Sequence, residues 1–334
     1  APRRIIAEAL FLPYLCLFPD RHSLSPFSMK QNDLLQIPYI NNILRKIRKS
    51  FFFFQFFLFF LPPPGHQGPP LPEDEAYIAL LRDVLLETVR LHPEALALAG
   101  NAGELEDNRR AGKVSALLTL EDGRAVDGRL ENLERFYGMG IRLISLTWNH
   151  ANCFGAPNSR DPEVMGRGLT AFGRDGVVRM EELGMLVDVS HLSDGGFWDV
   201  AELVKGPFAA SHSNCRALTP HPRNLTDEMI RAVADHGGVV GLNFAPEFVA
   251  APGEAVECTA ERLAVHARHL ADQGGIECVA LGSDLDGISG KIEVDEPEKL
   301  GVLFAALDRA GFREEEIERI AMGNALRVIR DVLG

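Results

Sequence analysis

Cysteine, tryptophan and positive charge are all scarce in this sequence of 334 residues. Its five cysteines are odd in number and scattered, and none forms a Cys-x-x-Cys pair, which argues against a disulfide framework and against a thiolate metal site. The net charge of −13 argues against nucleic acid or an anionic membrane surface as a partner. The apolar run from Phe51 to Leu61 has 11 residues, whereas a membrane-spanning helix needs about 20.

The first 64 residues differ in composition from the rest of the chain. They lack Gly, Val, Thr and Trp but contain 11 of the 20 Phe, and they carry eight Lys or Arg against three Asp or Glu. A basic cluster before the apolar run imitates a signal peptide, but it begins only at Arg45 and no small-residue cleavage site follows. Since no lipid-anchor signal is recognisable either, we expect a cytoplasmic protein. To explain the unusual composition, we hypothesise that part of this segment is misrecorded or altered. Mass spectrometry of the N-terminal peptides would test this.

From Gly112 onward, short apolar runs alternate with amphipathic helical stretches. Six such units have strands rich in Val, Leu, Ile and Ala, as in a parallel sheet that is buried on both faces. The runs at residues 3–12 and 51–61 would supply two more strands. Eight units predict a single α/β domain over residues 1–334, a (β/α)8 TIM-like barrel, with an open doubly wound sheet as the alternative. Thr226 and Thr259 are expected to cap the starts of two helices.

Polar side chains stand at or just past the carboxyl ends of the predicted strands: Glu121, His150, His191, His212, Asn243 and Asp284. Catalytic groups of a barrel lie on this rim. Each residue alone has an ordinary explanation, such as a hydrogen-bonded histidine or a charge at a helix start. Together, two histidines with a glutamate and an aspartate form a ligand set for a divalent cation, zinc first. A carboxylate among them could bridge two metals around a hydroxide.

A Pro-punctuated loop, "TPHPRNLTD", contains Arg223 near the same rim. Its guanidinium could bind a substrate carboxylate. An ordinary loop arginine without a binding role explains the sequence equally well. His221 in this loop is a weaker candidate. His266 and His269 fall on a predicted helix, where we expect them to face solvent.

Five blocks resemble the membrane (renal) dipeptidase family, most closely its bacterial soluble members. They are "LISLTWNHAN", "GLTAFGRDGVVRMEELGMLVDVSHLSDGGFWDV", "PFAASHSNCRALTPHPRNLTDEMI", "GGVVGLNF" and "LGSDLDGI". The resemblance runs from about Asp74 to the C-terminal "GNALRVI". It implies a barrel of the metal-dependent hydrolase type with two zinc ions, which hydrolyses dipeptides through a hydroxide held between the metals.

The resemblance also implies roles for individual residues. Glu121 would bridge the two metals, while His191 and His212 would hold the second zinc. Arg223 would bind the carboxylate of the dipeptide, and Asp284 would take a proton and orient the hydroxide or the leaving amine. His150 and Asn243 are further candidates for substrate binding. Because relatives often form dimers, a homodimer is possible.

The sequence departs from the family pattern at three places. The family's first strand, written "IIDxHxD", holds the first zinc, but the corresponding "RIIAEALFL" has Ala and Phe at the ligand positions, and neither Asp20 nor His22 has the right spacing. Trp148 stands where the family often has His, so polarisation of the substrate carbonyl would fall to His150. The usual "EGG" after the bridging glutamate is "EDG" here.

These departures leave two alternatives to the dipeptidase. One is a catalytically impaired relative that keeps one zinc site and binds a dipeptide-like ligand. The other is a single-zinc amidohydrolase.

Overall fold

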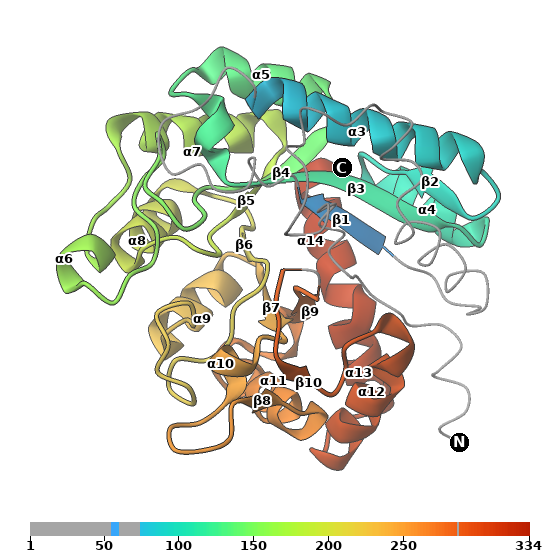
Figure 1. Ribbon diagram of the computed structural model, residues 1–334, viewed down its shortest axis with the longest axis vertical. Helices are drawn as coiled ribbons and strands as arrows, with labels where there is room; N and C mark the ends of the chain where they lie inside the picture. The colour runs from blue at the N-terminus through green and yellow to red at the C-terminus, as the bar shows by residue number, and fades with distance from the viewer. Residues whose placement is uncertain (1–54, 60–73, 286) are drawn as a thin grey trace.

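A computed structural model describes residues 55–59, 74–285 and 287–334 of the chain. In these ranges the main feature is a curled sheet surrounded by helices (Figure 1). Its strands are β1 (Gln55–Phe59), β2 (Leu96–Leu98), β3 (Val114–Glu121), β4 (Ile141–Ser145), β5 (Leu186–Asp188), β6 (Ala209–Ala210), β7 (Val239–Asn243) and β9 (Val279–Ser283). Two short strands, β8 (Glu257–Cys258) and β10 (Lys291–Ile292), pair with each other outside this sheet.

The order of the strands along the sheet is β1-β3-β4-β5-β6-β7-β9, with β2 also paired to β3. All of these pairs are parallel. The order follows the chain without reversing, whereas a doubly wound sheet reverses at a switch point. The predicted barrel-type α/β class is therefore confirmed. Of the two strands expected near the N-terminus, β1 lies within residues 51–61, and the stretch 3–12 is outside the described residues.

The strands form where the sequence is apolar on both faces. Every residue of β3, "VSALLTLE", is buried, including its terminal Glu121. Burial on both sides is what a parallel sheet covered by helices requires. The ionisable residues Glu121 and Asp188 stand at the ends of β3 and β5, where the chain leaves the sheet.

Helices cover the outer side of the sheet, with α3, α5 and α7 along one part of it and α11 and α12 along another (Figure 1). They are α3 (Asp74–Leu91), α4 (Ala102–Arg110), α5 (Leu130–Gly138), α6 (Pro162–Met165), α7 (Ala171–Leu183), α8 (Asp194–Leu203), α9 (Asp227–Asp235), α10 (Pro246–Val249), α11 (Ala260–Gly274), α12 (Leu300–Arg309), α13 (Glu314–Glu318) and α14 (Asn324–Leu333). The predicted caps are confirmed, because the hydroxyls of Thr226 and Thr259 accept from the backbone N–H of Met229 and Arg262.

Two glycines allow the strands beneath the rim to approach closely. A Cβ atom on Gly241 in β7 would lie 2.0 Å from the backbone oxygen of Ser211, and one on Gly282 in β9 would lie 2.1 Å from the same oxygen. Any side chain at either position would therefore displace Ser211, which directly follows β6.

The expectation that His266 faces solvent is wrong, since only 1% of this residue is exposed. Its helix, α11, buries the face that carries Leu263, Ala267 and Leu270, and helical spacing places His266 on that face. The ring Nδ1 accepts from the backbone N–H of Cys215 (3.2 Å), and Nε2 lies 3.4 Å from the Thr219 hydroxyl. His269 is half-buried and pairs with Asp227 at 2.7 Å.

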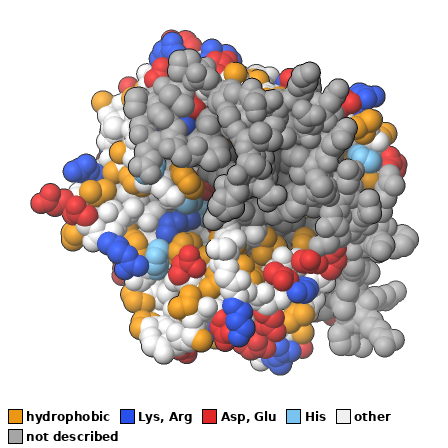
Figure 2. All heavy atoms as spheres, in the orientation of Figure 1, with side chains coloured by type: hydrophobic (Ala, Val, Ile, Leu, Met, Phe, Trp, Pro, Cys, Tyr) orange, Lys and Arg blue, Asp and Glu red, His pale blue; other side chains and the backbone are white. Residues whose placement is uncertain are grey.

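None of the helices in the described ranges combines the length and apolar character needed to cross a bilayer. On the face shown in Figure 2, acidic and basic side chains are intermixed with apolar ones wherever the structure describes the surface.

Candidate metal centre

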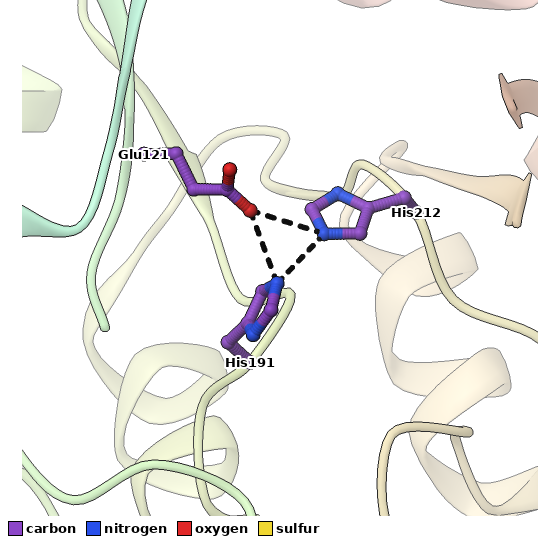
Figure 3. Close-up of side chains that lie close together, drawn as sticks. All are labelled: Glu121, His191 and His212. Atoms are coloured by element: carbon purple, nitrogen blue, oxygen red, sulfur yellow. Dashed lines mark hydrogen bonds and ion pairs between the residues drawn. The ribbon is translucent and has the colours of Figure 1, made fainter. Parts of the chain in front are cut away.

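Three buried side chains from separate parts of the sheet point toward one another (Figure 3). Glu121 Oε1 lies 3.0 Å from His191 Nε2 and 3.4 Å from His212 Nε2. The two Nε2 atoms are 2.9 Å apart. The grouping of Glu121, His191 and His212 matches the sequence expectation for the rim of the barrel.

The backbone at the strand ends positions these donors. Glu121 is the last residue of β3, His191 lies three residues beyond β5, and His212 lies two residues beyond β6. His191 has a left-handed backbone (φ 70°), and its carbonyl oxygen accepts from the backbone and side-chain N–H groups of Asn158. This turn directs a side chain that follows a strand back over the end of the sheet.

The spacing of the three donors suits a small cation. In a tetrahedral zinc site with bonds of about 2.0–2.1 Å, neighbouring donor atoms are about 3.3 Å apart. The three observed separations of 2.9, 3.0 and 3.4 Å are close to this edge length. One carboxylate and two imidazoles are also common zinc ligands. The residues therefore fit a zinc ion, with a fourth position left to water, substrate or another ligand.

Burial acts against charge on each of the three donors. It raises the pKa of Glu121 to about 8, against the opposing effect of Arg223. It lowers the pKa of His212 to about 4 and holds the pKa of His191 well below its usual range. Both imidazoles are therefore neutral near pH 7, the form in which histidine binds a metal.

Asp284 directly follows β9 and has a left-handed backbone (φ 65°). The residue as a whole is half-buried, but burial of its carboxyl group raises the pKa to about 6, with His212 acting in the opposite direction. Asn243, at the end of β7, donates to Asp284 Oδ2 at 3.0 Å. Its own Oδ1 accepts from the backbone N–H of Ala245 at 2.7 Å. Asn243 therefore holds the carboxylate of Asp284 in place.

Arg223 is buried beside the same donors. Its Nη2 donates to the backbone oxygen of His212 at 3.4 Å, and its guanidinium carbon lies 5.5 Å from the ring centre of Phe248. Its positive charge affects the pKa of all four ionisable groups, Glu121, His191, His212 and Asp284. Such a buried guanidinium can pair with an anionic group of a ligand.

The structure connects His150 less directly with the centre. The residue is half-buried, five residues beyond β4, and within the described ranges it forms no hydrogen bond with the three donors. The ring of Trp148 lies beside the centre, with its centroid 6.3 Å from that of His191. Trp148 therefore forms part of the wall beside this donor.

The "EDG" departure has a structural consequence. Asp122 has a φ of 77°, a conformation that favours glycine. Its side chain accepts from the backbone N–H of Arg124 at 3.0 Å and from Asn152 Nδ2 at 2.7 Å, and these bonds hold the unusual turn. The first-strand positions and the pair Asp20 and His22 lie outside the described residues.

Sequence reasoning missed Asp188, which terminates β5 and is fully buried. It accepts hydrogen bonds from four groups, one of them the hydroxyl of Ser211 next to His212. The sequence did contain a signal for this residue, since an aspartate stands inside the apolar run "MLVDVSH". A carboxylate that is buried in this way needs hydrogen-bond partners, which predicts a polar cluster around it.

A Glu–His–His cluster at the carboxyl edge of a curled, singly wound parallel sheet defines a metal-dependent hydrolase of the barrel class. Comparison with known proteins narrows this class. The family model described as membrane dipeptidase (peptidase family M19) matches residues 19–333. The chain belongs to this family, and it is an enzyme of the metallo-dipeptidase type. The match begins well before Asp74, where the recognisable sequence blocks start.

Individual proteins are similar to this chain in sequence or in structure. An uncharacterized protein in the pqqA 5′ region of Klebsiella pneumoniae is 37% identical over 244 residues, which cover 71% of this chain and 89% of that protein. The solved structure of the dipeptidase AC, a metallopeptidase of family M19, has a TM-score of 0.80 at 28% identity and covers 91% of this chain and 96% of its own. A metallopeptidase from Rhodobacter sphaeroides, solved with a phosphinate mimic of L-Ala-D-Ala, has a TM-score of 0.78 at 26% identity, with coverages of 90% and 96%. The chain spans only 53 to 63% of the length of three other matched dipeptidases.

Proposed function

We propose that this protein is a zinc-dependent dipeptidase that uses Glu121, His191 and His212 to hold the metal. The convergence of their three donor atoms within 3.4 Å of one another is the observation that carries the proposal. When bound, zinc would polarise the peptide carbonyl and supply a hydroxide nucleophile at neutral pH.

Asp284 is the proposed proton acceptor. Its raised pKa, about 6, lies near neutral pH, where a carboxylate can take up and release a proton during turnover. The hydrogen bond from Asn243 fixes which oxygen of Asp284 faces the reacting atoms. Asn243 would thus orient Asp284, and its expected contact with substrate stays a prediction.

Arg223 is the proposed binding group for the free carboxylate of the substrate. Because its charge is buried and close to the metal ligands, it favours a substrate whose carboxylate lies a short distance from the scissile bond. A dipeptide has this property, since its C-terminal carboxylate is only one residue away from the peptide bond. The dipeptide mimic bound to the Rhodobacter sphaeroides relative supports this choice of substrate class.

Turnover of substrate distinguishes this proposal from the impaired relative. Within the described ranges, one cluster of three ligands is present. The second metal that the family implies would need ligands from a segment where the sequence has Ala and Phe. A protein with one zinc ion and the Arg223 pocket, but without turnover, is therefore the second candidate.

The test combines elemental analysis with hydrolysis of a dipeptide panel that includes Ala–D-Ala. We expect bound zinc, hydrolysis that a chelator abolishes and zinc restores, and loss of activity toward the matching dipeptide amides. Arg223→Lys is the matched variant, because it keeps the charge but loses the planar fork, and it should mainly raise KM. Bound zinc with no hydrolysis of any dipeptide would favour the binding protein. Hydrolysis of amides or lactams in preference to dipeptides would favour the single-zinc amidohydrolase.

A homodimer and a cytoplasmic location remain predictions. Sedimentation analysis of the purified protein tests the first, and fractionation of the cells that produce it tests the second.

A further inference from the structure

We propose that Asp188, acting through Ser211, is a positioning residue that fixes the tautomer and orientation of His212 for metal binding. The inference rests on the proposed metal centre. It concerns a chain of two hydrogen bonds behind the imidazole, on the side opposite to the three converging donors.

The two bonds connect the carboxylate to the ring. Ser211 Oγ lies 2.6 Å from Asp188 Oδ2 and 2.8 Å from His212 Nδ1. A carboxylate can only accept, so the Ser211 hydroxyl donates its proton to Asp188. Ser211 Oγ must then accept from the ring, which places a proton on Nδ1 of His212. The lone pair of the imidazole is consequently on Nε2, the atom that faces Glu121 and His191.

The other contacts of Asp188 are also with hydrogen-bond donors. Oδ1 accepts from the backbone N–H groups of Ser190 (3.0 Å) and Ser211 (2.8 Å), and neither group can reverse its direction. Oδ2 accepts from the hydroxyl of Ser145 as well as from that of Ser211. Four donors are enough to stabilise a buried carboxylate without a basic partner. Its negative charge also makes the imidazole of His212 a stronger ligand.

The backbone of His212 is held at the same time. Its N–H donates to the Ser190 hydroxyl at 2.9 Å, and its carbonyl oxygen accepts from Asn243 and Arg223, each at 3.4 Å. His191 is anchored differently, because its buried Nδ1 has no hydrogen-bond partner among the described residues. Of the two imidazoles, His212 is therefore the one whose tautomer the surrounding structure determines.

A purely structural role for Asp188 must be separated from this one. The carboxylate joins the ends of three neighbouring strands, since Ser145 ends β4, Asp188 ends β5 and Ser211 follows β6. Ser145→Ala is the matched control for Ser211→Ala. Each variant removes one hydroxyl from the same carboxylate oxygen, but only Ser211→Ala breaks the link to His212.

Two measurements test the proposal. The first is the zinc dissociation constant of the parent, Ser211→Ala and Ser145→Ala, obtained by competition with a chromophoric chelator after removal of metal. Loss of a group behind a metal-binding histidine typically weakens affinity by about 10- to 100-fold. We expect a loss of this size in Ser211→Ala and an unchanged constant in Ser145→Ala. Equal losses in both variants, or none in Ser211→Ala, would overturn the proposal.

The second measurement is nitrogen-15 NMR of the histidine rings in the metal-free parent protein. We expect His212 to have its proton on Nδ1, and Ser211→Ala to have a mixture of the two tautomers. A proton on Nε2 in the parent would contradict the proposal even if zinc binds. If the parent binds no zinc, the proposed function fails, but the tautomer still reports on Asp188 and Ser211. The two failures are therefore distinguishable.

Discussion

Exchanging His266 for glutamine should remove part of the acid sensitivity of this protein. The pKa of His266 is lowered to about 4, mainly by burial; a hydrogen bond with the backbone of Val249 opposes this shift, and His269 adds a smaller lowering. In an unfolded chain the same ring has a pKa of about 6.5. Between these two values the unfolded chain binds a proton that the native protein does not bind. The stabilising contribution is therefore complete above about pH 6.5 and is lost as the pH falls toward about 4.

The size of the effect follows from this difference in pKa. One proton of difference changes the free energy of unfolding by about 1.4 kcal/mol per pH unit. Between pH 7 and pH 5, the parent should lose about 2 kcal/mol through His266 alone. Glutamine can reproduce the neutral ring, because its oxygen can accept from the backbone N–H of Cys215 and its amide can donate to the hydroxyl of Thr219. The variant should lack this loss.

Urea denaturation, followed by the fluorescence of the two tryptophans, measures the difference at pH 5, 6, 7 and 8. A chelator in the buffer prevents protons and metal from competing for the candidate centre. The groups of that centre titrate in both proteins, so their contributions to the free energy of unfolding cancel when the two proteins are compared. At pH 8 the parent and His266→Gln should unfold at similar urea concentrations, which shows that glutamine fits the site. Equal losses of stability in both proteins between pH 7 and pH 5 would refute the reasoning.

Other predictions concern the centre and the core. In the parent protein the buried guanidinium of Arg124 forms two hydrogen bonds with the carboxylate of Asp74. Asp74→Asn replaces this carboxylate with a neutral amide, and the substitution should lower the free energy of unfolding in urea by about 3 kcal/mol. Phe154→Ala empties a fully buried site and should cost about 3–5 kcal/mol, which calorimetry would detect as a lower Tm. Glu121→Gln removes the anionic ligand and should weaken zinc binding more than about 100-fold in the chelator competition, beyond any effect expected behind the histidines. Zinc at about 100 times its Kd should stabilise the metal-free parent by about 2.7 kcal/mol in urea, and a protein without a zinc site would gain nothing.

The grouping of Glu121, His191 and His212 could be predicted because one rule covers all three. Polar residues that end consecutive parallel strands meet at one edge of the sheet, whatever the loops between them do. The same rule placed Asp284 and Asn243 at this edge, but it did not predict the hydrogen bond between their side chains. That contact depends on the left-handed turn at Asp284, which has no signature in the residue types around it.

Asp188 shows the limit of reasoning from local pattern, whereas His266 shows a signal that was overlooked. His266 lies three residues after Leu263 and four before Leu270, a spacing that places it on the apolar face of α11. Asp188 belongs to an apolar run, and its function depends on hydroxyls from two other strands. Contacts between segments far apart in the sequence are invisible to local periodicity.

The close approach of Gly241 and Gly282 to the Ser211 carbonyl has a consequence for how this enzyme can change. The backbone that carries His212 rests directly on two positions where no side chain fits, so new residues there would move a proposed metal ligand before they altered any substrate contact. Diversification toward other substrates is thereby directed to the loops that follow the strands, such as the one that carries Arg223 and the segment around Phe248. Libraries for altered specificity should vary those loops and leave both glycines unchanged.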